Sequence, residues 1–168
     1  LRNQGIKFRF VARNCDDISL DVTKTYDLED LIRCLKPAIV INCIAEIDFE
    51  KCENNFRVTW GINVDTVAKL SWMSKLYKFK LVQISTDHYF VGKTKKRHSE
   101  NHSVTLVNNY SKQKYAAEIA SSTAKDALII RTSFTGSVPN NNIRKTFWNW
   151  TLQSIKGMKP VVLFNDAY

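Results

Sequence analysis

The sequence predicts an α/β protein in which helices cover a parallel β-sheet. Short runs rich in β-branched residues alternate along the chain with longer segments whose apolar residues recur at helical spacing. The length of 168 residues, with 44% hydrophobic and 24% charged residues, suits one domain with its own core. No apolar run approaches the roughly 18 residues that a membrane-spanning helix needs, so we expect no membrane partner.

Four segments are predicted as strands: 7–12, 38–44, 81–85 and 127–132. Segment 38–44 is apolar almost throughout, which is typical of a strand buried on both faces. It follows Pro37, which is expected to end the helix before it, because proline cannot continue a helix.

Four segments are predicted as helices: 27–35, 54–77, 110–123 and 140–155. Asn108 or Asn109 can cap the third, because an Asn side chain accepts from the free amides of a first turn. A loop is expected at 136–139. The residues expected on the core faces of the first two helices are Leu28, Leu31, Ile32 and Leu35, and Val58, Ile62, Val67, Leu70 and Met73.

The cysteines indicate reduced thiols in a cytoplasmic protein. Cys15, Cys34, Cys43 and Cys52 include no Cys-x-x-Cys pair, and the three histidines do not stand at zinc-finger spacing. We therefore expect no metal site. Cys34 and Cys43 are expected to be small apolar residues of the core.

The net charge of +9 raises the question of nucleic-acid binding, and the densest basic run is Lys93 to Arg97. No nucleic-acid-binding motif accompanies it, and a solvated loop would have the same composition. A basic surface also attracts phosphorylated small molecules. We therefore do not expect a nucleic-acid partner.

Two segments match the pattern Tyr-x-x-x-Lys, where about 0.6 matches are expected by chance for this composition. The spacing places the phenol and the ammonium on one face only in a helix. The residues from Tyr110 to Lys114 are compatible with a helix, whereas Gly92 and a Lys-rich loop disfavour a helix from Tyr89 to Lys93. We therefore select Tyr110 and Lys114.

Tyr110 and Lys114 have the chemistry of a proton donor and its partner. Ketone reduction needs a proton on oxygen, and a free phenol with a pKa near 10 transfers protons poorly at neutral pH. A neighbouring ammonium would lower the Tyr110 pKa, and the Thr86 hydroxyl could bond the substrate oxygen. Thr86 follows strand 81–85, at the strand end where open α/β sheets bind ligands. The alternative is a surface helix with a half-buried Tyr.

Several segments, in order, resemble the extended short-chain dehydrogenase/reductases, and among them the dTDP-4-dehydrorhamnose reductase family. They are Leu20 to Thr23, Lys36 to Ala45, Ile47-Asp48 with Lys51 to Glu53, Ile62 to Val64, Ile84 to Gly92, Asn109 to Lys114, and Ile130 to Phe134. The resemblance implies a Rossmann-like, doubly wound parallel sheet. It also implies NAD(P)H-dependent reduction of a nucleotide-linked 4-keto sugar in nucleotide-sugar and polysaccharide biosynthesis.

The resemblance assigns catalytic roles to Thr86, Tyr110 and Lys114. Tyr110 would donate the proton, Lys114 would hold the nicotinamide ribose and lower the Tyr110 pKa, and Thr86 would position the 4-keto oxygen. Thr86, Asp87 and Phe134 would face the sugar nucleotide. The residues implied in NADP or NAD binding are Asp21, Val22, Ile44, Ala45, Glu46, Ile84, Tyr110 and Lys114. Arg13 suggests NADP, without deciding between the two.

Asn63 resembles a helix asparagine that the family associates with a proton-relay water. A buried asparagine that kinks its helix is the alternative.

The chain departs from the family pattern in two ways. Glu46 stands in place of Tyr, Phe134 in place of Trp and Ser111 in place of Gly, which bears on the substrate more than on the reaction. The family's Gly-x-x-Gly-x-x-Gly loop, which cradles the pyrophosphate, does not occur in the sequence. We therefore expect a fold incomplete at both ends, with impaired cofactor binding. Residues 1–160 would form a partial NAD(P)-binding domain, and 161–168 would begin a substrate-binding region.

Two other functions are weighed against the reductase. The regulatory β subunit of methionine adenosyltransferase resembles the same reductases, so a non-catalytic nucleotide-binding regulator is the alternative. A basic nucleic-acid-binding domain is the third hypothesis. A second copy of the chain is considered as a partner in a homodimer.

Overall fold

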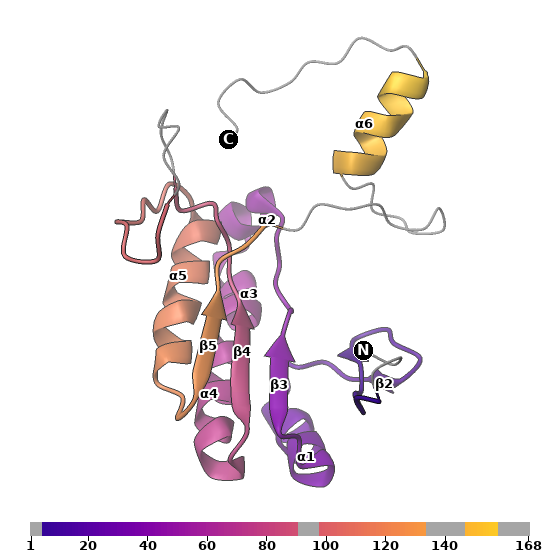
Figure 1. The fold of residues 1–168 in the computed structure, drawn as a ribbon, viewed down its shortest axis with the longest axis vertical. Helices are drawn as coiled ribbons and strands as arrows, with labels where there is room; N and C mark the ends of the chain where they lie inside the picture. The colour runs from indigo at the N-terminus through magenta and orange to yellow at the C-terminus, as the bar shows by residue number, and fades with distance from the viewer. Residues whose placement is uncertain (1–4, 91–97, 134–146, 158–168) are drawn as a thin grey trace.

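The computed structural model describes residues 5–90, 98–133 and 147–157. Its strands lie in two parallel sheets. The first pairs β1 (Val11–Ala12) with β2 (Ile18–Ser19). The second has the order β3 (Ile39–Asn42), β4 (Lys80–Ile84), β5 (Ala127–Ile130), and the first lies to the side of its β3 edge (Figure 1). This arrangement confirms the predicted α/β, Rossmann-like class.

The strand predictions hold best in the larger sheet. β3, β4 and β5 each fall on a predicted segment within a few residues. The prediction of a strand over 7–12 is wrong in length, because only Val11 and Ala12 pair with a neighbour. The partner strand β2 was not predicted, since two residues are too short to show any periodicity.

The helices are α1 (Thr25–Leu35), α2 (Phe49–Asn54), α3 (Phe56–Trp60), the π-helix η2 (Gly61–Asp65), α4 (Thr66–Tyr77), α5 (Asn109–Ser122) and α6 (Phe147–Lys156). α1 and α5 match their predictions. α6 overlaps the predicted helix 140–155 over residues 147–155. Residues 140–146 and the loop predicted at 136–139 lie outside the described ranges. Helix α1 ends with Lys36 in the left-handed conformation, at φ 46°, directly before Pro37.

The prediction of one continuous helix over 54–77 is wrong, because the π-helix η2 interrupts it. A π-turn inserts an extra residue and shifts the phase between the helical segments on either side. Val67, Leu70 and Met73 of α4 are buried as expected, whereas Val58 of α3 is 65% exposed. The apolar pattern was therefore correct only on the C-terminal side of the π-helix.

The core lies between the sheet and helices α1 and α4. Its buried residues are Val22, Leu28, Ile32, Leu70, Met73, Phe79 and Leu81. Helices α4 and α5 pack along the same side of the sheet (Figure 1). On the opposite face Ile39 and Ile41 are 55% and 58% exposed. The expectation that this strand has no exposed face is therefore wrong in the described part of the chain.

The predictions for the cysteines are partly correct. All four thiols are free, as expected, but Cys34 and Cys43 are exposed and only Cys52 is fully buried. Among the described residues no group of three His, Cys, Asp or Glu side chains could hold a metal ion. None of the described helices is long and apolar enough to cross a bilayer.

Candidate functional site

Thr86, Tyr110 and Lys114 gather where β4 ends. Each is buried, with 3%, 7% and 4% of its surface exposed. The Thr86 hydroxyl lies near enough to the Tyr110 phenol to lower its pKa, and the Thr86 Oγ1 accepts the His88 backbone N–H at 3.2 Å. The Lys114 ammonium donates to the Ile84 carbonyl at 2.8 Å. The residues selected from the Tyr-x-x-x-Lys pattern thus share one buried site at a strand end.

Helix α5 starts with a reciprocal capping box that places Tyr110 in its first turn. The Asn108 Oδ1 accepts the Ser111 N–H at 2.8 Å, and the Ser111 Oγ accepts the Asn108 N–H at 3.2 Å. Such bonds satisfy amides that have no partner within the helix. Asn108 is therefore the cap rather than Asn109. Ser111, which departs from the family glycine, has a structural role because its hydroxyl closes the box.

The Tyr110 pKa is raised above its ordinary value, mainly by burial, and the Thr86 hydrogen bond partly opposes this. The expectation that Lys114 lowers this pKa is therefore not met. Burial itself lowers the Lys114 pKa to about 8, against a raising effect of Glu118. The physical reason is that burial disfavours both the phenolate and the ammonium.

Two aromatic rings border Tyr110. The centroid of the Phe49 ring lies 5.1 Å from that of Tyr110, and the His88 ring lies 6.2 Å from it. Phe49 and His88 also meet edge to face at 5.6 Å. His88 and Asp87 are exposed, so this side of the site opens to solvent.

A cleft of about 250 Å³ lies between the smaller sheet and the loop after β3. Its lining residues are Ala12, Arg13, Leu20, Asp21, Val22, Thr23, Ile44, Ala45, Glu46 and Ile62. Five of the residues predicted to bind the cofactor thus line one cleft, while Ile84 lies at the Lys114 site. The Thr23 side chain and backbone bond the Asp21 carboxylate and lower its pKa, and Arg13 pairs with it at 3.3 Å.

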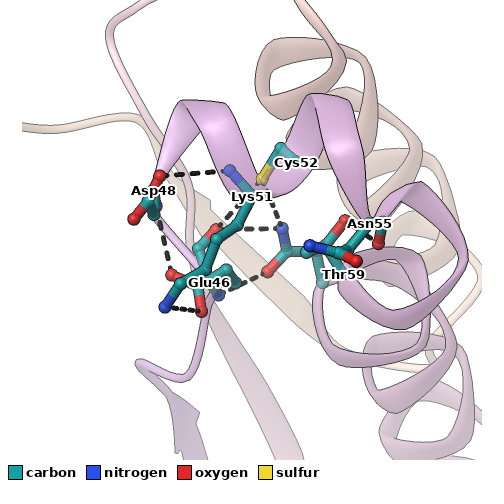
Figure 2. Close-up of polar contacts among 7 residues, drawn as sticks. Glu46, Asp48, Lys51, Cys52, Asn55 and Thr59 are labelled. Atoms are coloured by element: carbon teal, nitrogen blue, oxygen red, sulfur yellow. Dashed lines mark hydrogen bonds and ion pairs between the residues drawn. The ribbon is translucent and has the colours of Figure 1, made fainter.

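Asn63 in the π-helix holds the loop that lines this cleft. Its Oδ1 accepts the Glu46 N–H at 2.8 Å, and its Nδ2 donates to the Glu46 carbonyl at 3.1 Å. Figure 2 shows the same loop held from α2, where Lys51 and Cys52 lie beside Glu46. The Asn63 amide thus bonds the backbone of Glu46 through both of its polar atoms, and its proton-relay role stays a prediction.

A buried amide network joins this loop to α5 and was missed in the sequence. The Asn63 Nδ2 donates to the Gln113 Oε1 at 2.7 Å, and the Gln113 Nε2 donates to the Thr59 Oγ1 at 2.8 Å. Gln113 is fully buried one turn after Tyr110. Its position inside the Tyr-x-x-x-Lys segment, on the same helix face as Tyr110, is the signal that could have pointed to it.

Tyr89, the tyrosine of the rejected match, is part of the core. It is fully buried and its phenol bonds the Ser85 Oγ at 3.0 Å. The Arg131 guanidinium lies 5.2 Å from the centre of its ring and pairs with Glu118. Burial raises the Tyr89 pKa well above its ordinary range, so the phenol stays protonated.

Some predicted site residues lie outside the described ranges. These are Phe134 on the substrate side and the basic run from Lys93 to Arg97, which includes the lysine of the rejected match.

Comparison with known proteins identifies relatives over most of the chain. Residues 1–166 match the RmlD substrate-binding domain family. The chain is similar to the probable low-salt glycan biosynthesis reductase of Haloferax volcanii, with 27% identity over 91% of this chain and 52% of that protein. It is also similar to the dTDP-4-dehydrorhamnose reductase of Salmonella typhimurium, with 26% identity over 88% of this chain and 48% of that protein. The chain thus spans about half the length of these curated relatives.

Solved structures show the same likeness in the fold. The dTDP-4-dehydrorhamnose reductase of Bacillus anthracis in complex with NADP matches with a TM-score of 0.71 and 28% identity, covering 82% of this chain and 48% of that one. A hypothetical dTDP-4-dehydrorhamnose reductase of Sulfolobus tokodaii matches with a TM-score of 0.66 and 30% identity, covering 77% and 49%. By the match over residues 1–166, the chain belongs to the RmlD substrate-binding domain family.

Proposed function

We propose that the chain provides the proton-donating site and part of the cofactor cleft of an NAD(P)H-dependent reductase of nucleotide-linked 4-keto sugars. The observation that carries this proposal is the burial of Thr86, Tyr110 and Lys114 together at the end of β4. Relatives named as dTDP-4-dehydrorhamnose reductases support a dTDP-linked substrate and a place in rhamnose-type polysaccharide biosynthesis.

The cleft residues fit a nicotinamide dinucleotide. Val22, Ile44 and Ala45 offer apolar contacts to a flat ring. Asp21 is a carboxylate suited to a ribose hydroxyl, and Arg13 is a cation suited to a phosphate. Arg13 therefore favours NADP over NAD, and the Bacillus anthracis relative was solved with NADP. The cofactor would supply the hydride.

The protein's own groups would supply the proton and the orientation. The raised pKa keeps the Tyr110 phenol protonated at neutral pH but makes it a weaker acid than a free phenol. The proposed proton transfer therefore depends on how Thr86 and Lys114 orient the phenol and the substrate. The Thr86 hydroxyl, which lies beside that phenol, would bond the same keto oxygen. Lys114, held by the Ile84 carbonyl, lies one turn along α5 and would contact the nicotinamide ribose.

Replacing Tyr110 by Phe tests the proposed function in a version of the protein that also carries the glycine-rich phosphate loop. NADPH oxidation in the presence of a dTDP-4-keto-6-deoxy sugar should fall by at least about a hundredfold, the usual contribution of a general acid. Tyr115→Phe, on the same helix but outside the Thr86 and Lys114 contacts, is the matched control. Retained turnover in Tyr110→Phe would rule out this mechanism.

Two other outcomes discriminate the competing functions. Absence of NADPH oxidation together with co-purification of a synthetase would favour the regulatory subunit. Salt-sensitive binding to mixed DNA and RNA would favour the nucleic-acid hypothesis. Cytoplasmic localisation and a homodimer belong to the proposal as well, and cell fractionation and analytical ultracentrifugation test them.

A further inference from the structure

Helix α2 contacts the first turn of α5 at two points that are four residues apart. Phe49, the first residue of α2, places its ring 5.1 Å from the Tyr110 ring. Glu53, near the end of α2, accepts the Asn109 N–H on Oε1 at 2.8 Å and the Asn109 Nδ2 on Oε2 at 2.6 Å. Because residues at i and i+4 share a helix face, one face of α2 holds the segment that carries Tyr110.

The contact with Glu53 fixes backbone as well as side chain. The first amides of a helix have no acceptor within it. Asn108 and Ser111 satisfy each other in the capping box, and the amide of Asn109 finds its acceptor in Glu53. A carboxylate at this place also faces the positive end of the helix. Asn109 is thereby held at two atoms, directly before Tyr110.

Helix α2 is itself attached to the loop that lines the cofactor cleft. The Asp48 side chain caps α2 by accepting the Lys51 N–H at 3.1 Å. The Cys52 Sγ contacts the Glu46 carbonyl at 3.7 Å, and the Lys51 ammonium lies 3.5 Å from the Glu46 carboxylate (Figure 2). Cys52 is fully buried. The short helix therefore connects the cleft loop to the start of α5.

We propose that Glu53, together with Phe49, is a positioning residue that sets the place of Tyr110 relative to Thr86 and to the cleft loop. Glu53 contacts Asn109 rather than the reacting atoms, so it acts through α5. The effect of Glu53 on turnover rests on the proposed reductase function. The effect of Glu53 on the start of α5 is independent of that function, so the two effects can be measured separately.

Amide hydrogen exchange, followed by NMR on the intact chain, tests the structural consequence. In Glu53→Ala the Asn109 and Tyr110 amides should exchange about tenfold faster, while core amides such as Val82 and Met73 keep their rates. Glu53→Gln should restore most of the protection, because its side-chain oxygen still accepts the Asn109 N–H. Glu50→Ala, which removes an exposed carboxylate of the same helix, is the control and should leave both amides unchanged.

Two results would overturn the proposal. Unchanged exchange at Asn109 and Tyr110 in Glu53→Ala would show that the contact does not hold the turn. Uniformly faster exchange over the whole chain would show that Glu53 contributes general stability instead of local position.

Kinetics then test the catalytic consequence. Glu53→Ala should lower kcat about tenfold with little change in the KM for NADPH, and Glu53→Gln should recover it, because only the placement of the proton donor changes. A rise in KM with unchanged kcat would contradict the role at Tyr110. If the wild-type sequence does not oxidise NADPH even when it is joined to a glycine-rich phosphate loop, the proposed function fails, while the exchange measurement on the chain itself still decides whether Glu53 positions the turn.

Discussion

The Lys114 ammonium donates a 2.8 Å hydrogen bond to the Ile84 carbonyl and so ties the helix that carries Tyr110 to the end of β4. The same carbonyl accepts the Gln83 Nε2 at 2.9 Å. Ile84 therefore keeps a hydrogen-bond partner even without the lysine. The ammonium is nevertheless a buried cation, and its pKa is lowered to about 8.

Replacing Lys114 by Met should make the protein more stable at neutral pH. The folded pKa of about 8 lies below the ordinary 10.5, so the wild type loses stability as the pH falls through this window. The loss is complete below about pH 8. By linkage it is on the order of 3 kcal/mol. Urea unfolding of both proteins should show the advantage of Lys114→Met at pH 7 shrinking towards pH 10.5. A pH-independent difference would contradict the buried-cation interpretation.

Replacing Thr86 by Val should raise the Tyr110 pKa further. The Thr86 hydroxyl is the group that opposes the effect of burial on this phenol, and a hydrogen bond to the phenolate stabilises the charged form. The ring carbon signals of Tyr110, followed by NMR from pH 8 to 12, give the titration. Thr86→Ser keeps a hydroxyl and should titrate like the wild type. A lower midpoint in Thr86→Val would show that burial is not the main cause.

Removing the Asn63 side chain should destabilise the protein strongly. Asn63→Ala would leave the Glu46 N–H, the Glu46 carbonyl and the Gln113 side-chain oxygen without their bonds to it. Losing these hydrogen bonds of a buried side chain costs roughly 1 kcal/mol each, so a total of about 3 kcal/mol is expected in urea unfolding. Asn101→Ala, at an exposed position, serves as the control. A loss below about 1 kcal/mol would show that water replaces the amide.

The sequence predicted the parts of the fold that depend on periodicity within one element. The start of α5, the strands of the larger sheet and the grouping of Thr86, Tyr110 and Lys114 follow from patterns that are local or from strand order. The strand end brings Thr86 to α5 because parallel strands share their carboxyl edge.

The remaining features depend on contacts between distant segments. Glu53 and Asn109 are 56 positions apart in the sequence, and Asn63 and Gln113 are 50 apart. A pattern within one helix or strand therefore cannot predict either hydrogen bond. The direction of the Tyr110 pKa was also misjudged, because the pattern shows a neighbouring cation but not the burial, which is the largest cause of the raised pKa. Burial is a tertiary property, and so the environment of Tyr110 could not be read from the segment alone.

The buried ion pair of Arg131 with Glu118 should matter far more than an exposed one. Their side chains are 21% and 7% exposed and meet at 2.8 Å, whereas Lys80 and Asp126 are 41% and 62% exposed and meet at 3.4 Å. Arg131→Ala leaves a buried carboxylate and should cost about 3 to 5 kcal/mol in urea unfolding. Lys80→Ala should cost less than about 1 kcal/mol. Similar losses in both variants would show that the burial of Glu118 does not make its ion pair with Arg131 more important than an exposed one.

The chain of 168 residues should bind NADPH weakly. Among the described residues no strand pairs with the outer edge of β3, which is the edge nearest the cleft. The sequence also contains no glycine-rich loop whose amides would hold a pyrophosphate. Isothermal titration should therefore give an affinity weaker than micromolar. Whatever binding is seen should decrease in Arg13→Ala, because Arg13 is the cation that lines the cleft. Micromolar affinity would show that the walls present here are enough to hold the cofactor without such a loop.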